Sequence, residues 1–377
     1  MKLNELIDVY RRYLYLPDSG AIEIALGAVA ANRLPGDPVW TMLVGPPSSG
    51  KTEILSSLSL LPDIHEVSTI TQAGLLSGSL GRGENVTGGL LAEIGKFGII
   101  ACKDFTSILS ASPDTRTTTM AALREIYDGK WVRHLGTQGG RVLGWKGKVG
   151  FIGAVTEVID LHAATIGTMG ERFVFYRLPE LDHDERLALG HASLRLAGSQ
   201  GEMRRELAAR VRTFFDELPK RSELTELTDG EKNRLVALAD IATMCRSSVE
   251  RAGYDRDIEL VPQPEALGRL QSELVQLRRG LTEVGVSPSR IDELLTKVAL
   301  DGMSKTRRAI VEHFLKGDED AHVALYDLAE ELRLPAPTTR RALEELAAHG
   351  VVTKYGSSRS QVWRASAWLS KRWVAIG

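Results

Sequence analysis

The chain has 377 residues, of which 43% are hydrophobic and 25% charged, and its formal net charge is −2. This balance is ordinary for a soluble globular protein of two or three domains. A charge near zero excludes a globally basic nucleic-acid-binding chain, so any nucleic-acid surface has to be local. The two cysteines, Cys102 and Cys245, exclude a disulfide framework and a Cys-rich zinc site, and they suit a reducing cytoplasm.

The N-terminal segment MKLNELIDVYRRYLYLPDSG has no continuous apolar core after its charges, so we expect no signal peptide. No run approaches the ~18 uninterrupted apolar residues of a transmembrane helix. Both observations favour a cytoplasmic protein without a membrane partner. Residues 1–39 read as an N-terminal helical segment with a break at Leu16-Pro17-Asp18.

Five short apolar runs alternate with helical stretches in the next part of the chain, residues 40–179. The runs are TMLVG (41–45), HEVSTI (65–70), FGIIACKD (97–104), VGFIGAVT (149–156) and RFVFYRL (172–178). Such alternation predicts an α/β core around a five-stranded parallel sheet. After Pro179 the strand patterns stop, and residues 180–303 read as a helical lid with loops near 222–230 and 253–264.

A phosphate-binding loop (P-loop) follows the first of these runs. Its residues are Gly45, Pro46, Pro47, Ser48, Ser49, Gly50, Lys51 and Thr52. The pattern G-x-x-x-x-G-K-T between a strand and a helix is typical of a loop whose backbone N–H groups surround phosphates. Lys51 would then face the β- and γ-phosphates of ATP, and the Thr52 hydroxyl would bind Mg²⁺.

A second, acidic metal ligand is expected at the end of a neighbouring strand. Asp104 ends the run FGIIACKD and is the candidate, although a strand-end turn would also use an aspartate. Phe105 stands next, where many such ATPases have a glutamate that activates the attacking water. Glu93, Glu125 and Glu157 lie close in sequence to the same sheet edge, and the sequence does not choose among them. If none of these glutamates activates the water, we expect the protein to hydrolyse ATP slowly.

Residues 131–145, WVRHLGTQGGRVLGW, predict a β-hairpin with a glycine-rich tip. Its arms carry Arg133, His134 and Arg141. Taken alone, the stretch is an ordinary surface hairpin. Beside a nucleotide-binding core, its charges make it a candidate DNA-binding ribbon.

The order of these motifs resembles that of an AAA+ ATPase. The motifs come in this order: the P-loop, Asp104, the stretch TTTMAALREIYDG, the basic hairpin, VGFIGAVT and MGERF. The likeness covers roughly residues 38–280. More narrowly, the chain is similar to the minichromosome-maintenance-like helicases of phages and mobile elements. The resemblance implies an AAA+ three-layer core, a homohexameric ring with ATP and Mg²⁺ as ligands, and a hairpin that projects into the pore onto single-stranded DNA.

The resemblance also implies roles for three residues outside the P-loop. Thr156 ends the fourth strand, at the position of the polar sensor of the γ-phosphate. Arg172, in the sequence GERF, takes the position of the arginine finger offered to a neighbouring subunit, although it could instead cap the strand. Arg269, in PEALGRL, takes the position of the second sensor arginine or is a solvated helix residue. The large N-terminal DNA-binding region of the cellular relatives has no counterpart before the P-loop.

The last stretch, residues 304–377, has the pattern of a winged helix. Three helical segments precede two short strands. The helical segments are SKTRRAIVEHFLKG, ALYDLAEELRL and TTRRALEELAAHG, and the strands lie in VVTKYGSSRSQVWRAS. We expect Thr338 or Thr339 to cap the third helix, which places Arg340 and Arg341 in its first turn, where a recognition helix meets duplex DNA.

Local charge supports a DNA-binding role for this segment. Residues 338–377 hold seven Lys or Arg against two Glu, an excess that the near-neutral total hides. Lys354 and Tyr355 would contact phosphates from the wing. Winged helices also dock onto proteins, and that alternative stays open.

Together these features favour an ATP-dependent DNA helicase or translocase that replicates a phage or mobile element, with a primase or other replication protein as a possible partner. The first alternative is a helicase loader or transposition-type ATPase that uses ATP as an assembly switch, and Phe105 favours it. The second is a nucleotide-gated winged-helix transcriptional regulator. A small-molecule kinase would explain neither the lid arginine nor the C-terminal segment.

Overall fold

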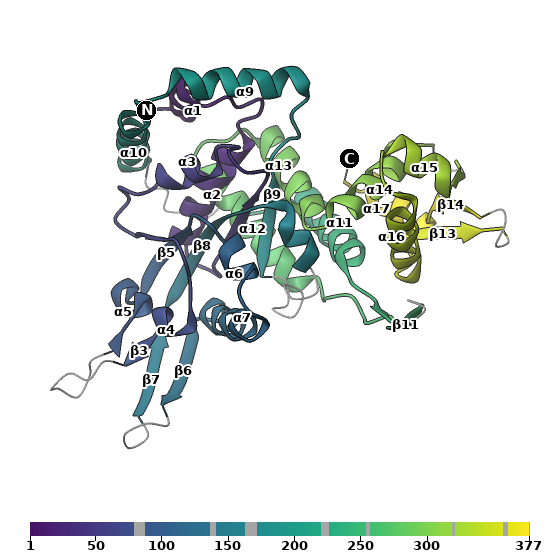
Figure 1. Cartoon of the computed structure of the whole chain (residues 1–377), viewed down its shortest axis with the longest axis horizontal. Coiled ribbons are helices and arrows are strands. Elements are labelled where there is room, and N and C mark those ends of the chain that lie inside the picture. The colour runs from purple at the N-terminus through teal and green to yellow at the C-terminus, as the bar shows by residue number, and fades with distance from the viewer. Residues whose placement is uncertain are drawn as a thin grey trace. The chain divides into compact units, whose positions relative to one another are not determined.

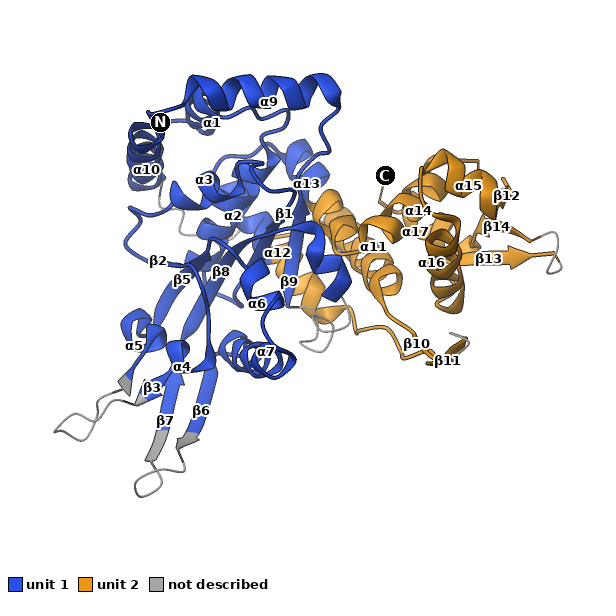
Figure 2. Ribbon diagram, viewed as in Figure 1, with its two compact units in different colours: residues 1–224, 276–294 blue, residues 225–275, 295–377 orange. Residues whose placement is uncertain are grey.

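The computed structural model divides the chain into two compact units, which are coloured separately in Figure 2. Unit 1 comprises Met1–Leu224 with Gln276–Leu294, and unit 2 comprises Thr225–Val275 with Leu295–Gly377. The division falls within two helices, α12 (Gly268–Glu283) and α13 (Pro288–Asp301). The structure describes residues 1–78, 87–135, 141–162, 172–219, 226–253, 257–318, 321–356 and 361–376.

Unit 1 is built around a five-stranded sheet in which every strand pair is parallel (Figure 1), as the sequence predicted. The strands are β1 (Trp40–Val44), β2 (Ile64–Val67), β5 (Phe97–Cys102), β8 (Lys148–Val155) and β9 (Phe173–Arg177), in the order β2-β5-β8-β1-β9. The second strand is shorter than the run HEVSTI, because it ends at Val67.

The register of the sheet brings the ends of its central strands to one edge. Val44 of β1 lies beside Val155 of β8, and Cys102 of β5 lies beside Gly153. Residues that follow these three strands therefore gather at the same carboxyl edge, which is where ligands bind in open parallel sheets. The P-loop, Asp104 and Thr156 all follow one of them.

Helices cover both faces of the sheet. Side chains that alternate along the strands, such as Trp40 and Phe151, enter one large core cluster with α7 (Pro113–Tyr127) and the short α5 (Leu90–Ile94) and α6 (Thr106–Leu109). On the other face α2 (Gly20–Arg33) and α3 (Lys51–Ser56) pack against β8.

The α2 helix lies close to the sheet because of a glycine. Asn32 of α2 donates from Nδ2 to the carbonyl of Val39 and accepts from its N–H, both at 2.9 Å. Gly150 of β8 faces this amide, and a Cβ there would lie 2.5 Å from the Asn32 side chain. The contact fixes the start of β1, the strand that leads into the P-loop.

The predicted hairpin is present as β6 (Lys130–Leu135) and β7 (Arg141–Lys146), which pair antiparallel. A second ribbon, β3 (Ser77–Gly78) with β4 (Thr87–Gly88), follows the short helix α4 (Gln72–Leu75). Arg133 of β6 donates from Nη1 to the carbonyl of Leu76 at 2.8 Å, so the two ribbons lie side by side (Figure 1). The tip at residues 136–140 and the side chains of His134 and Arg141 lie outside the described residues.

Three further helices of unit 1 stand at the P-loop side of the sheet: α1 (Leu3–Tyr13), α9 (His183–Arg195) and α10 (Gln200–Glu217). Arg204 of α10 forms two hydrogen bonds with the carboxylate of Glu53, at 2.6 and 2.8 Å. The hydroxyl of Tyr13 on α1 donates to Glu206 of α10. These contacts tie α10 to the helix that follows the P-loop.

Unit 2 contains helices and a small antiparallel sheet. Its complete helices are α11 (Asp229–Arg246), α14 (Lys305–Lys316), α15 (Leu325–Glu331), α16 (Ala336–Ala348) and α17 (Ala367–Val374). The strands β12 (Val323–Ala324), β14 (Val362–Ala365) and β13 (Val352–Tyr355) form one sheet, while β10 (Glu250–Arg251) and β11 (Ile258–Leu260) form a separate ribbon. The three helices and two strands expected after residue 304 are present, with β12 and α17 in addition.

The predicted cap of the third helix is wrong. The α16 helix begins at Ala336 with Pro335 as its N-cap, one turn before Thr338 and Thr339. Pro337 is tolerated there because the first helical N–H groups have no intrahelical partner to lose. Thr339 is fully buried and donates from Oγ1 to the carbonyl of Pro335. Arg340 and Arg341 therefore lie in the second turn, not the first.

Among the described residues, none of the helices combines the length and the apolar character that crossing a bilayer requires.

Candidate functional site

The P-loop leaves β1 and turns sharply at the carboxyl edge of the sheet. The N–H of Gly45 donates to the carbonyl of Val155 at 3.2 Å, which holds the start of the loop against β8. Ser48 and Gly50 have positive φ angles of 63° and 86°. Left-handed backbone at these two positions curls the chain into the tight loop that phosphate binding requires.

The side chain of Lys51 is buried inside this loop. Its Nζ donates to the carbonyls of Gly45 and Pro46 at 2.7 and 2.6 Å, and to Oγ of Ser49 at 3.1 Å. Burial lowers the pKa of Lys51 to about 8, while the carboxylates of Asp104 and Glu157 act in the opposite direction. A phosphate that replaces these acceptors would provide the negative charge that a desolvated ammonium lacks.

Asp104 and Thr156 lie next to each other at the edge of the sheet. The N–H of Phe105 donates to the carbonyl of Ala154 at 2.8 Å, and the N–H of Thr156 donates to Oγ1 of Thr106 at 3.2 Å. One carboxylate oxygen of Asp104 accepts from the N–H of Thr106 at 3.0 Å. Asp104 thus closes a turn and still acts electrostatically on Lys51.

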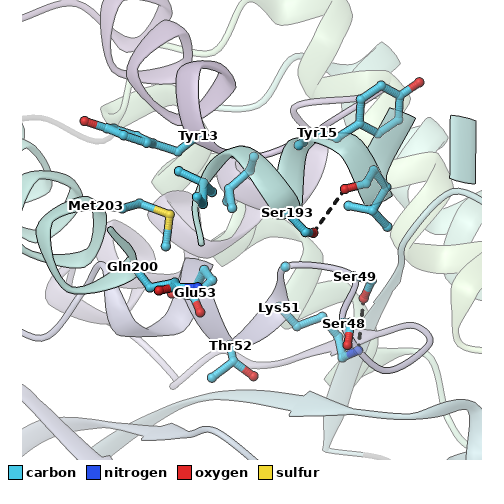
Figure 3. Close-up of a pocket in the computed structure, with 15 residues that line it drawn as sticks. Tyr13, Tyr15, Ser48, Ser49, Lys51, Thr52, Glu53, Ser193, Gln200 and Met203 are labelled. Carbon is cyan, nitrogen blue, oxygen red and sulfur yellow. Dashed lines mark hydrogen bonds between the residues drawn. The ribbon is translucent and has the colours of Figure 1, made fainter. Parts of the chain in front are cut away.

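A cavity of about 380 Å³ opens beside the P-loop (Figure 3). Residues from α1 and the segment after it, from α9 and from α10 form its far walls, with Tyr13, Tyr15 and Ser193 above the loop in the figure. Its other lining residues outside the P-loop are Leu14, Glu53, Leu189, Ala192, Leu196, Gln200 and Met203. A cavity of this size and mixed polarity falls within the range of small-ligand sites, roughly 300–1,000 Å³.

A second cavity, of about 490 Å³, adjoins the first part of the P-loop. Pro46, Pro47 and Ser49 line it from the loop, Glu157 from the turn after β8, and Arg186 from α9. Arg186 was not among the site residues predicted from the sequence. The pattern Asp182-x-x-Glu185 is a capping box that marks the start of α9, and it could have placed this arginine in the first turn of a helix.

The residues at this edge fit ATP and magnesium. The buried ammonium of Lys51 provides a charge for phosphate oxygens, and the exposed Thr52 hydroxyl and the Asp104 carboxylate provide oxygen ligands. Within the described ranges no group of three or more His, Cys, Asp or Glu side chains is arranged to hold a metal ion. Magnesium in nucleotide sites commonly uses one or two carboxylates together with substrate phosphates, and Thr52 and Asp104 stay its predicted ligands.

Arg172 has a partner within its own chain. Its Nη2 contacts both carboxylate oxygens of Asp128 at 3.0 and 2.9 Å, and its guanidinium lies 5.3 Å from the ring centroid of Tyr127. The side chain is 7% exposed, whereas that of Asp128 is 52% exposed. The arginine joins the start of β9 to the end of α7, and its role toward a neighbouring subunit stays a prediction.

We expect replacement of Arg172 by alanine to lower the free energy of unfolding by about 1–3 kcal/mol, because it removes a paired charged hydrogen bond and the stacking on Tyr127. Urea unfolding measures this loss. Arg195→Ala, at an exposed position of α9, should change stability by less than about 0.5 kcal/mol. An Arg172→Ala protein of unchanged stability would show that the ion pair contributes nothing to folding.

Arg269 belongs to unit 2, where its Nη1 donates to Glu265 at 2.7 Å. The same carboxylate accepts from Arg246, also at 2.7 Å. The P-loop belongs to unit 1. The structure therefore gives Arg269 a local ion pair, and its assignment as a nucleotide sensor stays a prediction.

The candidate DNA-binding residues of unit 2 lie on α16 and β13. Arg340 and Arg341 are exposed, and their neighbours Glu344 and Glu345 are held by Arg251 of β10, at 3.2 and 3.1 Å. This pairing compensates the acidic charge on α16. Lys354 lies 5.5 Å from the ring centroid of Trp363, and Tyr355, at 40% exposure, packs edge-on against His322.

No protein-family model matches the chain. No curated protein matches it either. Among solved structures, the chain is similar to the A form apo structure of the NrS-1 C-terminal region, with 12% sequence identity and a TM-score of 0.28 over 96% of this chain and 75% of that one. A likeness this weak carries no argument about function.

Proposed function

We propose that this protein is an ATP-dependent DNA helicase or translocase of the AAA+ class, acting as a homohexameric ring in the replication of a phage or mobile element. One observation carries the ATPase part of the proposal. The buried Lys51 ammonium lies in a P-loop at the same sheet edge as Asp104 and Thr156. This is the arrangement that nucleotide hydrolysis requires, namely a phosphate cradle with a metal-binding acid and a polar sensor beside it.

Each residue has a distinct task in this proposal. Lys51 binds the β- and γ-phosphates, and Thr52 and Asp104 hold Mg²⁺, which when bound neutralises charge on the phosphate oxygens. Thr156 reports the presence of the γ-phosphate through the hydrogen bonds that join it to Thr106 after β5. The cavity under α9 is large enough for the nucleoside.

DNA binding is assigned to two places. The β6–β7 hairpin would contact single-stranded DNA with Arg133, His134 and Arg141, although one N–H of Arg133 is already bound to Leu76. The C-terminal helices and three-stranded sheet of unit 2 would act as a winged helix on duplex DNA. Arg340 and Arg341 are exposed on α16, and Lys354 and Tyr355 are exposed on β13.

A second candidate is a helicase loader or transposition-type ATPase that uses ATP only as a switch. The observation in its favour is Phe105, which occupies the usual place of the catalytic glutamate and is fully buried. A slow or absent hydrolysis step would suit a switch.

A strand-displacement assay on a forked duplex tests the proposal. We expect the wild-type protein to separate the strands with ATP, and to fail with a non-hydrolysable analogue or with the Lys51→Ala substitution, because translocation needs repeated hydrolysis. Assembly on DNA that is equally efficient with ATP and with the analogue, and without any displacement, would instead identify the switch.

A further inference from the structure

The proposed motor needs a group that accepts a proton from the attacking water, and the residue after Asp104 does not supply it. Phe105 is fully buried, and its ring packs edge-on against Phe151 and Phe173 at centroid distances of 5.9 and 5.6 Å. A carboxylate in this aromatic cluster would lose its hydration without a partner, which is strongly unfavourable. The fold therefore uses this position for its core.

Two of the three acids that the sequence left open lie away from the cavities beside the P-loop. Glu93 of α5 contacts Nδ1 of His65 on β2 at 3.2 Å. Glu125 is exposed on α7. Neither residue lines a cavity beside the P-loop. Glu53 lines the first cavity, and Asp18 and Glu180 line the second, but none of these three is among the carboxylates that act on the pKa of Lys51.

Glu157 is placed differently. It follows Thr156 directly and begins the 3₁₀ turn Glu157–His162 at the carboxyl end of β8. Its side chain is exposed and lines the second cavity together with Pro46, Pro47 and Ser49 of the P-loop. Apart from Asp104, it is the one described carboxylate that acts on the pKa of Lys51.

The position of the cavity relative to the loop indicates which phosphate it would face. The first cavity is lined by Lys51, Thr52 and Glu53, where the loop continues into α3, whereas the second is lined by Pro46 and Pro47 at the start of the loop. Asp104 and Thr156 follow the strands next to β1. A nucleoside bound in the first cavity would therefore direct the γ-phosphate toward Pro46 and the edge that carries Thr156 and Glu157.

We propose that Glu157 is the general base of ATP hydrolysis, replacing the glutamate that is absent after Asp104. This inference rests on the proposed ATPase function. The oxygen of a water molecule forms a bond to the γ-phosphorus, and the bond from that phosphorus to the β–γ bridging oxygen breaks. The leaving electron pair stays on ADP. The Glu157 carboxylate takes the proton of the water and releases it to solvent with inorganic phosphate.

The test compares Glu157→Gln with the wild type in two measurements. The Kd of a fluorescent ATP analogue should stay within about threefold, because glutamine has the same shape. Steady-state hydrolysis should fall about 100-fold or more, as loss of a general base usually causes. Nucleotide retained after gel filtration should be ATP in Glu157→Gln and largely ADP in the wild type, which is a readout independent of turnover.

Matched variants and the wild type make the outcomes decisive. Glu93→Gln and Glu125→Gln should hydrolyse ATP at the wild-type rate, and Glu157→Asp should regain part of the activity because it keeps a carboxylate. Near-normal hydrolysis by Glu157→Gln, or a loss of binding equal to the loss of hydrolysis, overturns the proposal. A wild-type protein that binds ATP through Lys51 but never hydrolyses it also overturns it, while the nucleotide site stands. A wild-type protein that does not bind ATP removes both this inference and the proposed function.

Discussion

Replacement of Lys51 by alanine is expected to weaken ATP binding about 100-fold or more. Charge-assisted hydrogen bonds are worth about 1.5–3 kcal/mol each, and Lys51 would direct such bonds at two phosphates. Its Nζ donates to the carbonyls of Gly45 and Pro46, which alanine would leave without this donor. Isothermal titration calorimetry with ATP and Mg²⁺ measures the effect directly.

Lys148 provides a matched control for the loss of a lysine from the same unit. Burial lowers its pKa to about 8, as for Lys51, and its Nζ donates to the carbonyl of Leu34 at 2.7 Å. It lines neither cavity beside the P-loop. Lys148→Ala should therefore lower stability but leave the Kd for ATP within about threefold. Equal losses of affinity in the two variants would mean that Lys51 acts through stability alone.

The pKa of Lys51 also gives the affinity a pH dependence. Because burial lowers this pKa to about 8, the lysine is charged below that pH and neutral above it in the nucleotide-free protein. Phosphate stabilises the charged form, so ATP binding above pH 8 requires proton uptake. The affinity should fall as pH rises from 8 to 9, and Lys51→Ala should lose this part of the dependence. Titrations in buffers of different ionisation enthalpy count the protons taken up.

The strands and the P-loop could be predicted because their signals are local. An apolar run such as FGIIACKD predicts a buried strand irrespective of its position in the sheet. Gly45 and Gly50 mark the loop that follows β1. The register that brings Asp104 and Thr156 to one edge follows from parallel pairing. For these elements, the secondary structure that the local sequence favours is the one that the whole fold requires.

The remainder of the site depends on contacts between distant segments. Tyr13, Arg186 and Gln200 approach the P-loop only through the packing of α1, α9 and α10, and no spacing in the sequence encodes that packing. The sequence likewise could not favour Glu157 over Glu93 and Glu125 as the proposed general base, because that choice depends on which side chain lines a cavity beside the P-loop. The wrong cap at Thr338 has a local cause, since a proline pair starts α16 one turn earlier.

The double substitution Arg340→Ala with Arg341→Ala is expected to weaken duplex binding by about 30-fold or more at moderate salt. Each arginine that contacts a base edge contributes about 1–3 kcal/mol of discrimination. Both side chains are exposed in the second turn of α16, and the acidic residues one turn later are already paired with Arg251. Fluorescence anisotropy with labelled duplex at several salt concentrations gives both the affinity and its salt slope.

The full chain is the right material for this measurement, because Arg372 of α17 pairs with Asp240 of α11 at 2.6 Å and a C-terminal fragment would lose that contact. Lys316→Ala with Lys371→Ala removes the same number of positive charges from exposed positions of unit 2 and serves as the control. If the arginines contact phosphates, the salt slope should fall by roughly 0.9 for each one lost, whereas the control should keep the wild-type slope. If they read bases, preference for one duplex over another should disappear as well. Duplex binding that is equal in the double alanine variant, the control and the wild type would assign α16 to protein docking, and DNA contact would then have to come from the β6–β7 hairpin.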